Sequence, residues 1–298
     1  MSPTERPEFV DTHVHFWDQL VPGLRYDWLT ASGDPEETAV LGEYGAIRSE
    51  KYLPEDFRRE TRSVVPKGVV HVQAAGGSPD PVAESDWLAA ARRRTGLPTA
   101  FIGDARLDDP VALERTLARH RRHSGFRGIR DLQLSRYLSE SGCAESLGVL
   151  DREELILCDA DALSRLDETL ALVRRHEGLT YCVDHAMMPL RRDREYFTMW
   201  RTALSKVARL PNTVIKVSGL GQVDHDWTVD SLRPWIQACL EIFGADRVVF
   251  GTNWPVDRLY SSYADVVDAY VEACEELTAD ERTAVLSGNA WRLFGLDG

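Results

Sequence analysis

Hydrophobic residues along the chain gather in short, β-branched runs, and longer segments of helical periodicity separate these runs. The eight runs are residues 9–16, 68–75, 99–106, 126–132, 155–159, 180–185, 213–218 and 247–252. The helical segments are residues 80–95, 110–123, 162–176, 196–209, 230–243, 263–276 and 280–286. Short apolar strands that alternate with helices predict a parallel sheet, because each parallel connection needs a crossover.

Eight strand-helix units in 298 residues fit the size of a closed (β/α)8 barrel of the TIM type. An open, doubly wound sheet is the alternative, but no glycine-rich turn follows the first strand as a dinucleotide site would require. We find no internal repeat and no linker, so residues 1–298 are expected to form a single domain. A long loop, about residues 18–63, follows strand one and holds several aromatic residues, which is typical of a functional lid.

Composition and charge narrow the class of protein. The chain is 43% hydrophobic and 28% charged, as in ordinary globular proteins, and no apolar run approaches the roughly 20 residues of a membrane span. A net charge of −13 argues against nucleic-acid binding. The five scattered cysteines suggest free thiols in a reducing compartment. We therefore expect a cytoplasmic enzyme with a small-molecule substrate, no membrane partner and the possibility of homo-oligomers.

The first strand carries unusual chemistry for a barrel interior. Regular alternation along a strand would place Asp11, His13 and His15 on one face, where apolar residues are usual. Two imidazoles two residues apart on a strand can reach one metal ion or one substrate group. This stretch is the first candidate for an active site.

Other polar residues end or follow the remaining strands, and active sites of such barrels lie at those carboxyl ends. They are His71, Gln73, Asp104, Arg106, Arg127, Arg130, Asp159, Asp184, His185, Lys216, Ser218, Asn253 and Asp257. Core packing does not explain imidazole, guanidinium or carboxylate groups at so many strand ends.

Several of these motifs resemble the amidohydrolase superfamily, in the branch of sugar-lactone hydrolases and 2-pyrone-4,6-dicarboxylate lactonase. The resemblance rests on residues 11–17 (DTHVHFW), 128–130 (GIR), 184–185 (DH), 216–220 (KVSGL) and 250–257 (FGTNWPVD). The resemblance implies a (β/α)8 barrel that opens a cyclic ester with water. By position, His13 and His15 match the His-x-His pair of the family, and His185 matches its strand-six histidine.

The resemblance also implies roles for other side chains. Arg130, and with it Arg127, match arginines that hold carboxylate or carbonyl oxygens of a substrate, so an anionic substrate is expected. Further substrate-binding candidates are His71, Gln73, Trp17 and Trp28. The family usually has Asp on strand eight, which takes the proton from water. This chain has Asn253, an amide without proton affinity near neutral pH.

The departure at Asn253 leaves the base and the cofactor open. An imidazole of the His13 and His15 pair, or Asp257, could take the proton from water. His13, His15 and His185 could together hold one divalent ion, with zinc the expected metal, but the lactonase that the chain resembles works without metal. From the sequence, one weakly held divalent ion and no metal ion are equally expected.

Three interpretations of function follow. The first is a hydrolase that opens a lactone or similar cyclic ester bearing a carboxylate. The second is a lyase, decarboxylase or cyclase on the same barrel, which needs no activated water and therefore does not require the strand-eight Asp. The third is a barrel that binds a ligand without turnover.

Overall fold

A computed structural model describes residues 6–30, 45 and 47–296, so part of the predicted long loop, residues 31–44 and 46, lies outside the described residues. Eight parallel strands form one sheet in the order β1-β4-β5-β6-β7-β8-β9-β10. Their bounds are β1 Val10–Val14, β4 Gly68–Val72, β5 Ala100–Asp104, β6 Phe126–Arg130, β7 Ile156–Asp159, β8 Thr180–Val183, β9 Thr213–Val217 and β10 Val248–Phe250. A parallel bridge between Val14 and Trp254 joins the first strand to the segment after the last. The predicted (β/α)8 barrel is confirmed.

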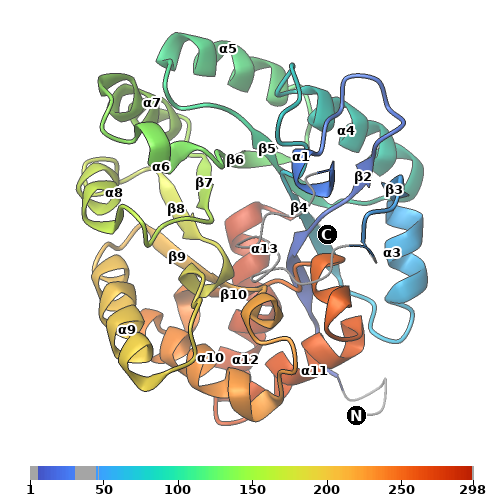
Figure 1. The fold of residues 1–298 in the computed structure, drawn as a ribbon, viewed down its shortest axis with the longest axis vertical. Helices are drawn as coiled ribbons and strands as arrows, with labels where there is room; N and C mark the ends of the chain where they lie inside the picture. The colour runs from blue at the N-terminus through green and yellow to red at the C-terminus, as the bar shows by residue number, and fades with distance from the viewer. Residues whose placement is uncertain (1–5, 31–44, 46, 297–298) are drawn as a thin grey trace.

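Helices form a ring around this sheet (Figure 1). The α-helices are α1 Asp27–Thr30, α3 Pro54–Glu60, α4 Ala83–Thr95, α5 Pro110–His120, α6 Leu134–Tyr137, α7 Ser141–Arg152, α8 Leu166–Val173, α9 Arg194–Ala208, α10 Val229–Phe243, α11 Tyr263–Ala273, α12 Ala279–Thr283 and α13 Asn289–Phe294. Shorter turns are η2 His185–Met187, η3 Leu220–Val223, η4 Ala245–Arg247, η5 Val256–Leu259 and η6 Ala284–Gly288. Among the described residues, no helix is long and apolar enough to cross a membrane.

The strands and helices match the expected ranges, apart from their ends. Each strand is up to three residues shorter than its apolar run, because residues at the carboxyl ends turn into the loops. Within the predicted long loop, β2 (Trp17–Asp18) pairs antiparallel with β3 (Lys51–Tyr52), and α3 begins at Pro54. This small sheet packs beside the mouth of the barrel.

Two hydrophobic layers hold the barrel. The larger one lies between the strands and the surrounding helices, and the smaller one fills the interior of the barrel. In the interior, Phe294 and Leu296 of the C-terminal segment pack against strand residues such as Val10 and Val249. Figure 1 shows α13 across the centre of the ring. The helix closes the end where the strands begin, so the opposite, carboxyl end remains for the site.

A β-bulge in β1 changes which side chains face the interior. Asp11 pairs with Val69 and Val14 with His71, so three steps on β1 match two on β4. Bulges of this kind re-aim side chains next to active sites. Asp11 faces outward, where it accepts hydrogen bonds from Thr252 and Tyr263. The expectation that Asp11 shares a face with His13 and His15 is therefore wrong.

Candidate active site

Three imidazoles meet at the carboxyl end of the barrel. His13 and His15 come from the end of β1, and His185 begins the turn after β8. The ring centres of His13 and His185 lie 4.5 Å apart, and those of His13 and His15 lie 4.9 Å apart. The structure thus brings the three histidines together, as the family resemblance implied.

The His13 and His15 side chains have a defined hydrogen-bond geometry. Nδ1 of His15 lies 2.8 Å from the carbonyl oxygen of Val72, so this nitrogen carries the proton and donates it. Nε2 of His15 therefore keeps its lone pair and lies 3.2 Å from Nε2 of His13. Close packing makes this arrangement possible, because a Cβ at Gly251 would lie 2.5 Å from Cβ of His13.

His185 sits in strained backbone. It begins four consecutive non-glycine residues, His185 to Met188, whose φ values lie between 44° and 60°. Left-handed conformations cost free energy for such residues, and they cluster at functional sites. The turn directs Nδ1 of His185 to within 2.9 Å of Oγ of Ser218.

A buried ion pair lies directly below the imidazoles. Nζ of Lys216 is 2.8 Å from Oδ1 of Asp184, and neither side chain has any solvent exposure. The same carboxylate lies 3.7 Å from Nδ1 of His13 and 3.7 Å from a terminal guanidinium nitrogen of Arg130. Burial alone would raise the pKa of Asp184, but the charge of Lys216 and the nearby histidines bring that pKa well below its usual value.

The imidazoles are neutral at physiological pH. Burial is the largest cause, and it lowers the pKa of His13 and His15 well below the usual value for histidine. Burial likewise lowers the pKa of His185 to about 4. Neutral imidazoles have lone pairs that can bind a metal ion or accept a proton, and their lowered pKa values make them weaker bases than an exposed histidine.

Arg130, at the end of β6, points into the same region and is only 6% exposed. Its Nε donates to Oε1 of Gln73 at 3.2 Å, and a terminal nitrogen donates to the Gln73 carbonyl oxygen. These bonds leave few donors for a substrate oxygen.

Asn253 and Asp257 form a pair after β10. Nδ2 of Asn253 donates to Oδ2 of Asp257 at 2.8 Å, and Asn253 has a φ of 57°. Burial raises the pKa of Asp257 to about 7. Both side chains are buried, with Asp257 3% exposed and Asn253 2% exposed.

Other expected side chains lie elsewhere. Arg127 lies near the start of β6, at the end of the barrel opposite the histidines, where it donates to the carbonyl oxygens of Phe294 and Gly295 in the C-terminal segment. The expectation that Arg127 contacts the substrate is wrong for the same reason.

His71 and Trp17 also face away from the cleft. His71 points outward from β4, where Nδ1 accepts from the Phe16 amide and Nε2 lies 3.3 Å from Oε1 of Glu84. Glu84 was not predictable from the sequence, because an acid in the first turn of a helix has no distinctive pattern. Trp17 is fully buried and packs against Trp28, whose ring centre lies 6.1 Å from that of His15. Trp28 is therefore the tryptophan that borders the site.

Two nitrogens are suitably placed for a metal ion. Ligand nitrogens about 2.0–2.1 Å from a tetrahedral zinc ion are roughly 3.3 Å apart, close to the 3.2 Å between Nε2 of His13 and Nε2 of His15. The bond from His15 to Val72 is the outer support that metal-binding histidines usually have. These two residues fit as ligands, whereas His185 would have to move to join them.

The structure contains one compact group of possible metal ligands elsewhere. Among the described residues, this group consists of Cys158, Cys182 and Asp184, whose possible ligand atoms all lie within 4.8 Å of one another. The ammonium of Lys216 already occupies this position, 3.8 Å from Sγ of Cys158 and 2.8 Å from Asp184. This group therefore holds an internal cation.

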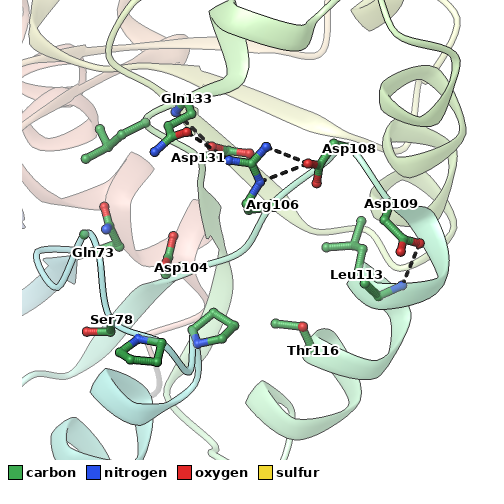
Figure 2. Close-up of a pocket in the computed structure, with 16 residues that line it drawn as sticks. Gln73, Ser78, Asp104, Arg106, Asp108, Asp109, Leu113, Thr116, Asp131 and Gln133 are labelled. Carbon is green, nitrogen blue, oxygen red and sulfur yellow. Dashed lines mark hydrogen bonds and ion pairs between the residues drawn. The ribbon is translucent and has the colours of Figure 1, made fainter. Parts of the chain in front are cut away.

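A cavity of about 620 Å³ lies at the carboxyl ends of β4, β5 and β6 (Figure 2). The loops after β4, β5 and β6 form its walls, and its polar lining includes Gln73, Asp104, Arg106, Asp131 and Gln133. Gln73 both lines the cavity and accepts a hydrogen bond from Arg130, whereas none of the three histidines is among the lining residues.

Comparisons with known proteins find similarity to amidohydrolases and lactonases. The family model described as amidohydrolase matches residues 162–296. The L-fucono-1,5-lactonase of Burkholderia ambifaria is 29% identical over 97% of this chain and 96% of its own length. A crystal structure of an amidohydrolase from Burkholderia multivorans with bound zinc has a TM-score of 0.80 at 26% identity, covering 97% of this chain and all of the other.

A more distant structure shows the fold alone. The 5-carboxyvanillate decarboxylase of Novosphingobium aromaticivorans is 16% identical with a TM-score of 0.65, over 97% of this chain and 96% of the other. Sequence similarity along the chain, the barrel and the histidine cluster lead to one conclusion. The chain is similar to amidohydrolases in sequence and in fold, and these similarities identify it as an enzyme of the hydrolase type.

Proposed function

We propose that the enzyme hydrolyses a lactone, opening the ring to the hydroxy acid. The observation that carries the proposal is the buried His13 and His15 pair, with its 3.2 Å separation and one defined tautomer, beside the Arg130 guanidinium. The L-fucono-1,5-lactonase relative supports this reaction type.

In this mechanism His15 is the general base. Its Nε2 lone pair takes a proton from water as the water oxygen attacks the lactone carbonyl carbon. A free donor of Arg130 stabilises the negative charge that develops on the carbonyl oxygen. The proton on His15 then passes to the ring oxygen as the carbon–oxygen bond breaks, which yields the carboxylic acid and the alcohol.

A divalent ion held by Nε2 of His13 and Nε2 of His15 would occupy the lone pair that otherwise serves as the base, so in that case Lewis-acid activation of the water would replace general-base catalysis by His15. Asn253 cannot replace the base, since an amide does not accept a proton near neutral pH. Its hydrogen bond to Asp257 fixes which end of the amide turns away, and the amide oxygen remains as an acceptor that orients water.

The test compares His15→Asn with the parent on a panel of five- and six-membered lactones, with ring opening followed by acid release. Removal of a general base should lower kcat by about a hundredfold or more. Arg127→Gln is the matched control, because its side chain binds the C-terminal segment, and it should keep the parent rate. Undiminished hydrolysis in His15→Asn would contradict the assignment of the base.

A second candidate function is decarboxylation, which needs no activated water. The amide at Asn253, where the family usually has a carboxylate base, is the observation that favours it. A parent enzyme that releases carbon dioxide from hydroxybenzoates but opens no lactone would favour this alternative.

A further inference from the structure

Arginine is concentrated in two neighbouring segments of the helical ring. Residues 92–94 (RRR) lie in the last turn of α4, and residues 119–123 (RHRRH) span the end of α5 and the turn after it. The two helices follow one another around the barrel (Figure 1). In a (β/α)8 barrel the helices run opposite to the strands, so both segments lie at the end where β5 and β6 begin. This end is opposite to the carboxyl end, where the three imidazoles lie.

A cavity of about 400 Å³ lies between these two segments. Phe101, which is only 1% exposed, forms part of its wall. Nε2 of His123 lies 2.8 Å from Oδ1 of Asp86, which is outside the lining. Among the described residues, no carboxylate lines the cavity, whereas its lining includes the guanidinium groups of Arg92, Arg93 and Arg122 beside the His123 imidazole. The cavity therefore concentrates positive charge on a chain whose net charge is −13.

The three guanidinium groups of the lining have no acid partner. Arg92 donates to the neutral hydroxyl of Ser124 at 2.8 Å. Across the part of the chain that the structure describes, the side chains of Arg93 and Arg122 make neither a hydrogen bond nor an ion pair. Like charges that share a cavity repel one another, and a bound anion relieves this repulsion. The donors of these arginines are therefore available to an anionic ligand.

The arginines next to the cavity are paired differently. Arg94 pairs with Glu55 at 3.6 Å, and Arg121 pairs with Glu153. The helix dipole favours cations in the last turn of a helix, which accounts for the arginines at the end of α4. The dipole does not explain why the arginines without acid partners come from two segments and line one cavity.

Gly125 leaves room for the cations. A Cβ at this position would lie 3.3 Å from a terminal nitrogen of Arg92 and 3.1 Å from the Phe101 ring. Any other residue would therefore crowd both the guanidinium that binds Ser124 and the apolar part of the wall.

We propose that this cavity binds the phosphate group of a small phosphorylated molecule, at a site separate from the imidazoles. A planar guanidinium can donate two parallel hydrogen bonds to phosphate oxygens. Arg93 and Arg122 come from different segments, so their guanidinium groups can hold one phosphate from two sides. A phosphate group has close to two negative charges and three acceptor oxygens at pH 7. A carboxylate has one charge and two oxygens, so it matches the three guanidinium groups less well.

The charges around the cavity favour a small ligand over a polymer. Glu55 and Glu153 neutralise the arginines on either side, so the positive charge does not continue along the surface as a stripe. Nucleic acids require an extended basic face. A compact set of cations in a cavity is instead suited to a single phosphate group.

The experiment is calorimetry with phenyl phosphate and with benzoate, which has the same ring and a carboxylate. It is done with EDTA, which removes metal ions that phosphate would bind, and in about 0.15 M salt, which screens isolated surface charges beyond roughly 8 Å. The parent should bind phenyl phosphate with a Kd below about 1 mM, and benzoate about tenfold more weakly. Arg93→Gln combined with Arg122→Gln should weaken phenyl phosphate binding about tenfold or more.

Arg94→Gln combined with Arg121→Gln is the matched control, because it removes two positive charges from acid-paired arginines next to the cavity. The control should keep the parent's Kd. Phenyl phosphate should raise the Tm of the parent and of the control, but not that of Arg93→Gln with Arg122→Gln. An equal loss of affinity in the two double variants would overturn the inference, because net charge would then explain it. A parent that binds no phenyl phosphate, or binds benzoate equally well, would overturn it too.

A measurement on the parent alone locates the ligand. In nuclear magnetic resonance spectra, phenyl phosphate should shift the ring-proton signals of His123, which lines the cavity, and leave those of the three site imidazoles in place. Shifts at the site imidazoles without a shift at His123 would contradict the assignment. Tighter binding of a single-stranded oligonucleotide or of anionic vesicles through the same two arginines would contradict it as well. All of these measurements report binding, so they do not depend on the proposed lactone hydrolysis.

Discussion

Replacing Lys216 by Met should destabilise the enzyme strongly, because it leaves a charge buried beneath the imidazoles. Lys216 and Asp184 are fully buried, with Nζ 2.8 Å from Oδ1. At that distance the attraction is about 6 kcal/mol for an effective dielectric constant near 20. Measured losses on breaking a buried pair are roughly 3–5 kcal/mol. For a chain of this size, that corresponds to a fall in Tm of about 5–8 °C.

The assay is urea denaturation with EDTA present, followed by circular dichroism. Lys206→Met is the matched control, since Lys206 makes an exposed pair with Asp167 at 2.9 Å and its loss should cost less than about 1 kcal/mol. Adding Asp184→Asn to Lys216→Met should restore most of the lost free energy of unfolding, because no uncompensated charge remains. The native-state pKa of Asp184 is lowered by Lys216, so the penalty should shrink as acidification protonates the carboxylate.

A loss in Lys216→Met no larger than that in Lys206→Met would refute the reasoning. A double variant no more stable than Lys216→Met would refute it too, because the cost would then come from packing.

Two further predictions concern the strand-eight pair and pH. Asp257→Asn should lower kcat about tenfold and leave KM unchanged, because it removes the carboxylate that accepts from the Asn253 amide at 2.8 Å and orients it. Asp257→Glu should restore part of the rate. Equal kcat values in the parent and Asp257→Asn would contradict this prediction. The free energy of unfolding should change by less than about 1 kcal/mol between pH 6.5 and 8, because two opposing contributions nearly cancel. The folded-state pKa values of Asp104 and Asp257, about 7, lie above their unfolded values, so the folded protein loses their protons, and with them stability, as pH rises through 7. The folded-state pKa values of His13, His15 and His185 are lowered, so across this range these groups lose protons in the unfolded state, which raises the free energy of unfolding; thermal melts that show a large change in either direction would contradict the assignment.

Local patterns predicted the barrel well, because apolar runs and helical periodicity reflect which faces are buried. The predicted ends of strands and starts of helices were less accurate, because contacts with loops and caps determine the conformation of the boundary residues. His13, His15 and His185 were also predictable, because imidazoles at strand ends have no role in core packing. The bulge in β1 was not predictable from the sequence. It depends on how β1 pairs with β4, and the alternation of polar and apolar residues does not indicate it.

Amino-acid order alone therefore determined the eight-stranded barrel, the end of the barrel that bears chemistry and the three histidines at that end. Tertiary structure decided which polar side chains reach the cleft. Arg127 and Arg130 lie three residues apart on one strand, yet one binds the C-terminal segment and the other binds Gln73 beside the histidines. Tertiary structure also decided which charged side chains are paired. Lys216 and Asp184 form an ion pair in the interior, whereas the Asp104 carboxylate faces a cavity without a partner among the described residues. The physical reason is that burial, pairing and pKa depend on distances between strands that are far apart in the sequence.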